Sequence, residues 1–127
     1  MVATDRIGEL FADARGMYES ALERVAQGDV RDTAEKAWCA TLLATNALIL
    51  ARTGDEPQRT PGTSIELGKL ADRDRAIQSL TGRYYSRRGQ LHGECFYLGF
   101  CEPVAQTERR IRDTIAYVQD AEVLART

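Results

Sequence analysis

Apolar residues recur at steps of three and four along the first part of the chain, the spacing that places them on one face of a helix. The pattern predicts a first helix over residues 5–27, with charged residues on its other face and a glycine, Gly28, at its end. This stripe consists of Ile7, Leu10, Phe11, Ala14, Met17, Tyr18, Ala21, Leu22 and Val25. We expect the helix to pack on the rest of the protein through this face.

The next segment is apolar nearly all round, because no residue in 37–51 is charged. A second helix is predicted from about residue 32 to about residue 53, with Asp32 and Glu35 as a capping box at its start. We expect this helix at the buried centre of the fold, where small Ala and Thr side chains let its neighbours approach closely. Asn46 is the strongly polar residue within it and needs a hydrogen-bond partner.

The second half of the chain reads as further helices joined by short connections. Residues 54–62 form a loop with two prolines and two glycines, and Thr63 and Glu66 suggest a capping box for the next helix. Residues 72–98 are mostly helical in pattern, and their glycines predict a break or kink between Gly82 and Gly93. One last helix is expected after Pro103. Because no strand is apparent, we predict a single all-α domain over residues 1–127, an antiparallel up-down bundle of four to five helices.

Composition narrows the class of protein. A hydrophobic fraction of 43% and a net charge of −2 indicate an ordered domain whose overall surface does not attract nucleic acid or membranes, so any polyanion site must be a local patch. No apolar run approaches the roughly 20 residues needed to span a bilayer. Three cysteines without the spacing of a disulfide framework, and without a signal peptide, predict buried thiols in a reducing cytoplasm.

The lone histidine, His92, is the only side chain whose unperturbed pKa lies near neutrality. Residues 69–92 hold six Lys or Arg against two Asp, a local basic patch that also contains Tyr84 and Tyr85. Guanidinium groups beside an imidazole, flanked by aromatic rings, suit the binding of a phosphate and the transfer of a proton next to it. The alternative is a solvated arginine face on a helix and a histidine with a structural role.

Other candidate sites are weaker. His92, Cys95 and Cys101, with Cys39 or Glu94 as a fourth ligand, match no common zinc spacing, so neither a metal nor a cofactor is expected. The chain has no glycine-rich phosphate loop after a strand and no nucleophile elbow, which excludes the common nucleotide hydrolases. Glu35 and Lys36 are interpreted as charges on a helix surface.

The string RRGQLH, residues 87–92, fits the pattern of an arginine, four to six residues and a histidine that is typical of the HEPN family (higher eukaryote and prokaryote nucleotide-binding domain). An amphipathic first helix, the helix in GDVRDTAEKAWCATLLATNALILARTG and a polar loop are similar to the opening of small HEPN proteins. The motif falls on the predicted fourth helix, where that family carries it. The resemblance therefore covers nearly the whole chain.

The resemblance implies a four- or five-helix bundle that forms homodimers. Active HEPN proteins are metal-independent ribonucleases whose motifs pair across the dimer, and many small ones are toxins with a nucleotidyltransferase-type antitoxin as partner. Others only bind nucleotides, RNA or proteins, which is the alternative function here. Some toxin members carry a tyrosine two residues after the histidine, which the partner modifies, whereas this chain has Glu94.

The resemblance implies Arg87 and His92 as catalytic residues, and we predict that Arg88, Arg83 and Tyr84 of the same basic stretch bind the substrate. Since one histidine cannot be base and acid at once, two subunits would each supply a His92. On a regular helix, residues five apart are about 140° out of phase, whereas residues four apart nearly coincide. Unless the helix is distorted at Gly89, regular geometry therefore places Arg88 on the same face as His92. The family pattern instead indicates Arg87 as the arginine of the site.

Overall fold

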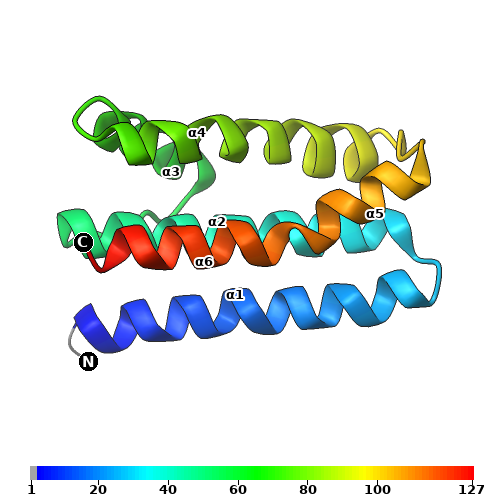
Figure 1. Cartoon of the computed structure of the whole chain (residues 1–127), viewed down its shortest axis with the longest axis horizontal. Helices are drawn as coiled ribbons and strands as arrows, with labels where there is room; N and C mark the ends of the chain where they lie inside the picture. The colour runs from blue at the N-terminus through cyan, green and yellow to red at the C-terminus, as the bar shows by residue number, and fades with distance from the viewer. Residues whose placement is uncertain (1–2) are drawn as a thin grey trace.

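The computed structural model describes residues 3–127, which fold into helices joined by short turns and loops. The elements are α1 (Ala3–Ala26), α2 (Val30–Thr53), α3 (Thr60–Ala71), α4 (Arg75–Arg87), the π-helix η1 (Arg88–Tyr97), α5 (Val104–Arg112) and α6 (Thr114–Ala125). α1 and α2 form a hairpin, α4 and η1 run on as one rod, and α5 and α6 return in the opposite direction (Figure 1). The predicted all-α antiparallel bundle is confirmed.

α2 lies at the centre of the bundle, as predicted. Half of its 24 residues are buried, and it packs against every other element. Its small residues Ala37, Ala40, Ala44 and Ala47 are fully enclosed, so the surrounding helices come close to its backbone. Although α2 is the most apolar of the long helices, no helix within residues 3–127 has the length and hydropathy needed to cross a membrane.

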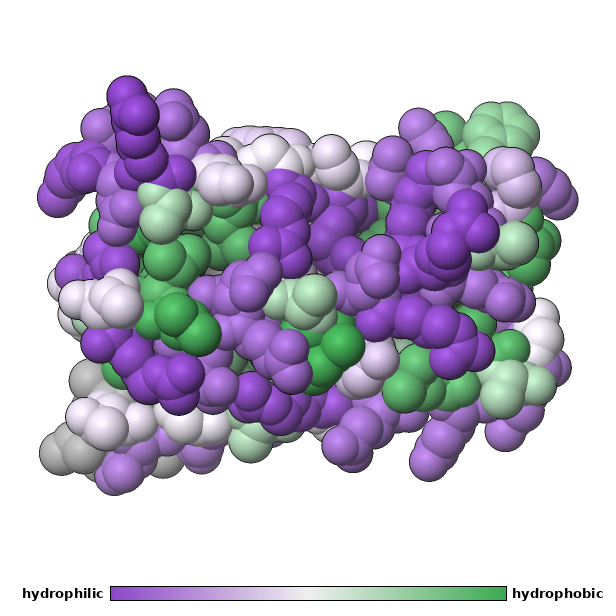
Figure 2. Space-filling model, viewed as in Figure 1, coloured by the Kyte–Doolittle hydropathy of each residue, from purple (hydrophilic) through white to green (hydrophobic). Residues whose placement is uncertain are grey.

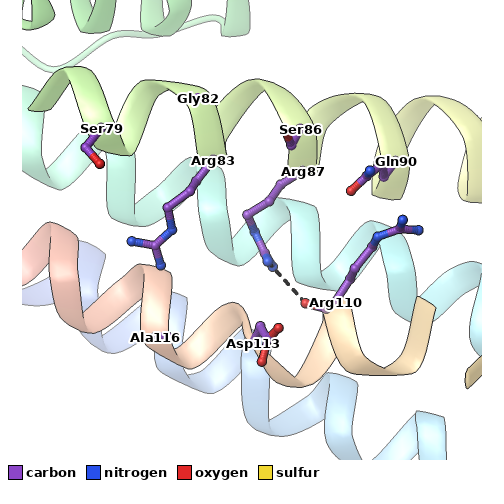
Figure 3. A pocket seen from close by; sticks show the side chains of 9 residues that line it. All are labelled: Ser79, Gly82, Arg83, Ser86, Arg87, Gln90, Arg110, Asp113 and Ala116. Carbon is purple, nitrogen blue, oxygen red and sulfur yellow. Dashed lines mark hydrogen bonds between the residues drawn. The ribbon is translucent and has the colours of Figure 1, made fainter. Parts of the chain in front are cut away.

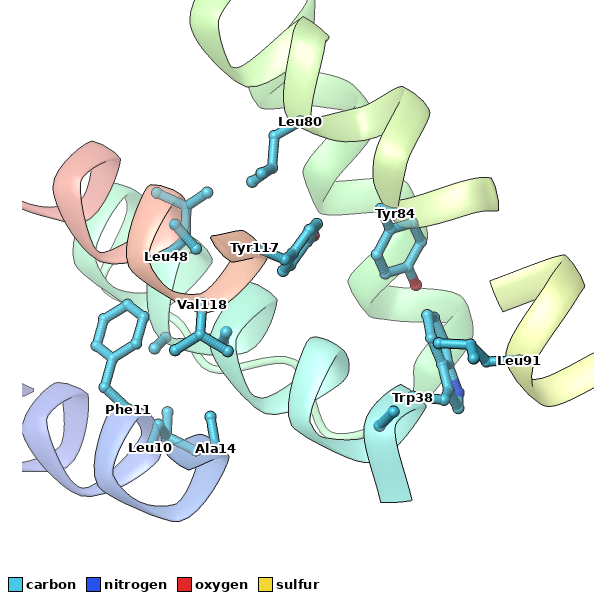
Figure 4. Packing of buried hydrophobic residues seen from close by; sticks show 14 of the residues in the cluster. Leu10, Phe11, Ala14, Trp38, Leu48, Leu80, Tyr84, Leu91, Tyr117 and Val118 are labelled. Carbon is cyan, nitrogen blue, oxygen red and sulfur yellow. The ribbon is translucent and has the colours of Figure 1, made fainter. Parts of the chain in front are cut away.

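The hydrophobic core lies on two sides of α2. Figure 4 shows Leu10, Phe11, Leu48 and Val118 between α1, α2 and α6, and a second group between α2 and the α4–η1 rod. This second group includes Leu80, Tyr84, Leu91 and Trp38. The core therefore holds the rod against the same helix that supports α1 and α6.

Two polar residues within α2, Asn46 and Thr45, form hydrogen bonds with other helices. The sequence indicated that Asn46 needs a hydrogen-bond partner, and its Oδ1 accepts a hydrogen bond from the Thr63 hydroxyl of α3 at 2.7 Å. The Thr45 hydroxyl lies 2.7 Å from the hydroxyl of the buried Tyr117 of α6. Because an unpaired polar group is costly inside a protein, these bonds set how α3 and α6 sit on α2.

Both predicted capping boxes are wrong. α2 begins two residues earlier than expected, at Val30, because the Asp29 side chain accepts from the backbone N–H of Asp32. α3 begins at Thr60 with a proline in its first turn, and Thr63 already lies inside it. Glu35 is therefore not engaged in a cap and is free to contact another element.

The predicted break between Gly82 and Gly93 does not occur, because α4 passes into η1 without interruption (Figure 1). The helix changes its winding instead, to the i→i+5 hydrogen bonds of a π-helix, and the Leu98 N–H closes the last turn on the carbonyl of Gly93. Each mid-helix glycine costs only about 1 kcal/mol, which the burial of Leu91 and Cys95 offsets. π-helical turns are frequent at functional sites.

The end of the chain differs from the prediction in two ways. The single last helix is divided at Asp113 into α5 and α6. Cys95 and Cys101, expected as thiols, form a disulfide, because the chain turns back after η1 at Gly99, where φ is +78°. Cys39 is the free cysteine among residues 3–127. The cysteines therefore no longer argue for a reducing compartment.

We expect Leu48→Ala to lower the free energy of unfolding by about 2–5 kcal/mol, because it leaves a cavity where α1, α2 and α6 meet. Ile65→Ala on α3 is the matched control, since Ile65 is 58% exposed and its loss should change stability by less than about 1 kcal/mol. Urea unfolding followed by circular dichroism measures both. Equal losses in the two variants would contradict this description of the core.

Candidate functional site

The five residues predicted for the site all lie on the rod of α4 and η1, but they face different neighbours. Tyr84 and His92 face α2, whereas Arg83 and Arg87 face α5 and α6. Arg88 is exposed and lies near Tyr84. The predicted site is thus divided in two, which we call the histidine site, around His92, and the arginine groove, around Arg87.

The histidine site is built on a contact between η1 and the first turns of α2. His92 Nδ1 lies 2.7 Å and 3.0 Å from the two carboxylate oxygens of Glu35. An ionised carboxylate only accepts hydrogen bonds, so Nδ1 carries the proton and donates it. In the neutral imidazole this leaves Nε2 as the free basic nitrogen. The His92 side chain is 42% exposed, which a group that exchanges protons with a substrate requires.

Aromatic rings hold the imidazole of His92 in place. The Phe96 ring, one turn along η1, stacks on it at 6.1 Å between centroids, and the Trp38 ring of α2 lies 6.3 Å away. Tyr84 packs in turn on Trp38. It was predicted to bind substrate, which is wrong, because the side chain is fully buried and its hydroxyl bonds to Ser64 of α3. Burial raises the pKa of that hydroxyl, so Tyr84 is a support for the site and stays neutral.

Arg88 is exposed and lies close enough to Tyr84 to act on its hydroxyl, whereas Arg87 is buried. The guanidinium of Arg88 opposes part of the rise in the tyrosine pKa. No acidic partner is paired with Arg88 among residues 3–127. Arg88 is therefore an exposed cation on the rod, and which arginine acts with His92 stays a prediction.

Arg87 points into the bundle and is only 9% exposed. Its Nε donates to the Thr41 hydroxyl of α2 at 2.9 Å, Nη1 donates to the Arg110 carbonyl of α5 at 3.1 Å, and Nη2 donates to the Thr114 hydroxyl of α6. Burial lowers the pKa of the guanidinium to about 10, so it remains charged at neutral pH. The expected pairing of Arg87 with His92 in one subunit's site is not found.

The arginine groove lies between α4 and the α5–α6 pair and has a volume of about 610 Å³. Arg87 is at its floor, with Arg83 and Arg110 on either side (Figure 3). Arg83 is paired with Asp120 of α6 at 2.6 Å. Figure 2 shows the same face of the bundle, which is mostly hydrophilic with hydrophobic patches between. Arg83 therefore belongs to this groove and not to the histidine site.

No cluster of three or more His, Cys, Asp or Glu side chains within residues 3–127 has the arrangement of a metal site. Of the ligands considered from the sequence, Cys95 and Cys101 are joined to each other. Burial raises the pKa of the remaining Cys39 thiol, which disfavours the thiolate that binds metals.

Two residues of these sites were missed in the sequence. Glu35 was interpreted as a surface charge, yet it binds His92, which is 57 residues away along the chain. Arg110 was not considered, and it joins the groove only because α5 packs beside α4. No local pattern identifies either residue. A hint existed for Glu35, which lies one helical turn before the buried Trp38 and so shares its face.

Comparison of the chain with models of known protein families, with curated proteins and with solved structures finds no significant match.

We expect the neutral imidazole of His92 to carry its proton on Nδ1, because Glu35 accepts from that nitrogen. ¹⁵N NMR of the ring, observed above the pH at which the histidine loses its charge, distinguishes the two tautomers. Glu35→Ala should shift the population towards the Nε2–H form. Glu19→Ala is the control, since Glu19 is exposed on α1 and should leave the spectrum of His92 unchanged. An Nε2–H tautomer in the unmodified protein would contradict the assigned geometry.

Proposed function

We propose that this chain is a HEPN-type protein that cleaves RNA without a metal ion, with His92 as its acid–base group. The single observation that supports this most is the contact between His92 Nδ1 and the Glu35 carboxylate, which leaves Nε2 of a half-exposed imidazole free. A carboxylate that fixes the tautomer of a histidine and stabilises its charged form is a common device of acid–base catalysis. The bundle architecture and the motif on its fourth long segment are compatible with the resemblance.

The reaction assigns each residue a task. The 2′-hydroxyl of the RNA attacks the adjacent phosphorus, a base removes its proton, and an acid protonates the 5′-oxygen that leaves. A neutral His92 supplies the base and a protonated His92 supplies the acid, so two subunits are required for one cleavage. Arg88 is exposed, lies four residues before His92 and is unpaired with any carboxylate in the described chain, and we assign to it the contact with the phosphate.

The site also bears on partners and location. A homodimer follows from the need for two histidines, and a nucleotidyltransferase-type antitoxin is proposed as a second partner on the resemblance alone. Glu94 stands where some toxin members carry the tyrosine that such a partner modifies, so modification at that position is not part of the proposal. A cytoplasmic location is proposed because RNA substrates are found there.

A second candidate function is a module that binds nucleotides, RNA or a protein without cleaving them. The observation that favours it is the position of Arg87, whose side chain is bound inside the bundle and does not face the same space as His92. In this case the motif would lack part of its catalytic chemistry, and His92 with Arg88 would serve only for binding.

Incubation of the purified protein with end-labelled RNA in the presence of EDTA tests the proposed reaction. We expect cleavage that leaves 2′,3′-cyclic phosphate and 5′-hydroxyl ends, because the 2′-hydroxyl is the nucleophile. His92→Ala should abolish it, and Glu35→Gln should slow it by about 10- to 100-fold, as the loss of an orienting carboxylate does elsewhere. Glu19→Gln on α1 is the matched control.

A His92→Ala variant as active as the unmodified protein would refute the assignment. RNA binding without cleavage in the unmodified protein would instead favour the second candidate function.

The requirement for two histidines predicts a dimer in solution. Light scattering coupled to size exclusion should give twice the subunit mass of 14.1 kDa at the concentration used for cleavage. Mixing inactive His92→Ala subunits with unmodified subunits should lower the activity more than simple dilution does, because mixed dimers lack one of the two groups. A monomer that cleaves RNA at full rate would contradict the two-histidine scheme.

A further inference from the structure

The last turn of η1 has backbone carbonyls that its own helix cannot satisfy. Because the hydrogen bonds of a π-helix run from residue i to residue i+5, the carbonyls of residues 93–97 have no partner within it. The N–H groups of the turn that follows bond to the carbonyls of residues 93–95. Arg31 of α2 binds the other two, because its Nε donates to the Phe96 carbonyl at 2.7 Å and its Nη2 donates to the Tyr97 carbonyl at 3.1 Å.

Arg31 stands at an unfavourable place in α2. It is the second residue of that helix, at the positive end of the helix dipole, where a cation is disfavoured. Its side chain is exposed and is paired with no carboxylate among residues 3–127. At η1 the same charge meets the carbonyls at the C-terminal end of a helix, which is the negative end of that dipole. The position of Arg31 is therefore explained by η1 and not by α2.

Gly99 and the disulfide shape the backbone around this guanidinium. A Cβ at Gly99 would lie 3.3 Å from Cζ and 3.3 Å from Nη1 of Arg31, closer than such atoms normally come. The φ of +78° at Gly99 also favours glycine. The disulfide between Cys95 and Cys101 closes the loop that contains this glycine. The loop after η1 is thus a preformed surface for the guanidinium.

α2 therefore binds η1 at two points that are one helical turn apart. Arg31 and Glu35 are four residues apart, which places them on the same face of α2. Glu35 binds the imidazole of His92, and Arg31 binds the carbonyl of Phe96. The Phe96 ring stacks on the same imidazole. Arg31 is thus linked to His92 through a single residue of η1.

We propose that Arg31 is a positioning residue of the histidine site, which holds the last turn of η1 in its π-winding and thereby keeps His92 beside Glu35. The α-helix is the far commoner winding, and its i→i+4 bonds would rotate the side chains of the turn about the helix axis. Without the two hydrogen bonds from Arg31, the carbonyls of Phe96 and Tyr97 accept from water and no longer hold the turn to α2. The catalytic consequence rests on the proposed cleavage, but the effect on the geometry of His92 does not.

¹⁵N NMR of the His92 ring in the disulfide-bonded protein tests this role with Arg31→Gln, which removes the paired donors. We expect part of the population to move from the Nδ1–H to the Nε2–H tautomer. The amides of residues 98–100 should exchange about tenfold faster, the change expected for one lost hydrogen bond. The midpoint of urea unfolding should stay nearly unchanged, because Arg31 is exposed and its loss leaves no cavity. Arg75→Gln is the matched control, since Arg75 is also an exposed arginine in the first turn of a helix, α4.

Arg31→Lys separates charge from hydrogen-bond geometry. Lysine keeps the charge but lacks the paired planar donors, so the His92 spectrum should lie between those of the unmodified protein and Arg31→Gln. In the RNA cleavage assay, Arg31→Gln should lower kcat about tenfold and leave KM unchanged, because Arg31 acts on the imidazole and not on the substrate.

A His92 spectrum that Arg31→Gln leaves unchanged, or changes no more than Arg75→Gln does, would overturn the proposal. So would a loss of unfolding stability without a change at His92, since that result marks a purely structural role. If the tautomer shifts but the unmodified protein cleaves no RNA, the proposed function fails and the positioning role of Arg31 stands.

Discussion

The enclosure of α2 on every side is the constraint on which this structure depends. A polar group buried in such a helix needs a hydrogen-bond partner, and three of its polar residues find one on a surrounding helix. The Thr41 hydroxyl accepts a hydrogen bond from Arg87 of α4, and the Thr45 hydroxyl is hydrogen-bonded to the hydroxyl of Tyr117 on α6. Asn46 accepts a hydrogen bond from the hydroxyl of Thr63 on α3. Apolar packing holds the helices together, and these directional bonds decide how each one is positioned along α2.

The same arrangement builds the histidine site. η1 packs against the first turns of α2 through its buried residues and through Trp38. This packing places Glu35 next to His92 at the edge of the core. The carboxylate is held by a packed helix and not by a loop, so the imidazole has a fixed orientation and a fixed tautomer. Such rigidity favours proton transfer, because the group already has the required geometry before a substrate binds.

The rod of α4 and η1 presents different chemistry on its two sides. Towards α2 it carries His92 with aromatic support, and towards α5 and α6 it carries a buried guanidinium beside an open groove. Arg87 and Arg88 are neighbours in the sequence, but they point in different directions because successive residues of a helix are rotated by about 100°. Arg87 therefore points into the bundle, and Arg88 is exposed to solvent. A short motif therefore cannot by itself state which of its residues share a site.

The sequence by itself determined the all-α class, the central position of α2 and the basic character of the rod, because helical periodicity and an uncharged stretch are local properties. It also identified His92 as the titratable group to examine. Tertiary structure alone decided that Glu35 orients His92, that Arg87 is internal, that Arg110 enters the groove and that Cys95 and Cys101 are joined. The positions of Glu35, Arg87 and Arg110 depend on contacts between elements that are far apart in the chain. The disulfide depends on how the chain turns after η1. The pattern along the sequence can place a residue on a face of its helix, as it does Glu35 beside Trp38, but it does not show which distant residue it contacts.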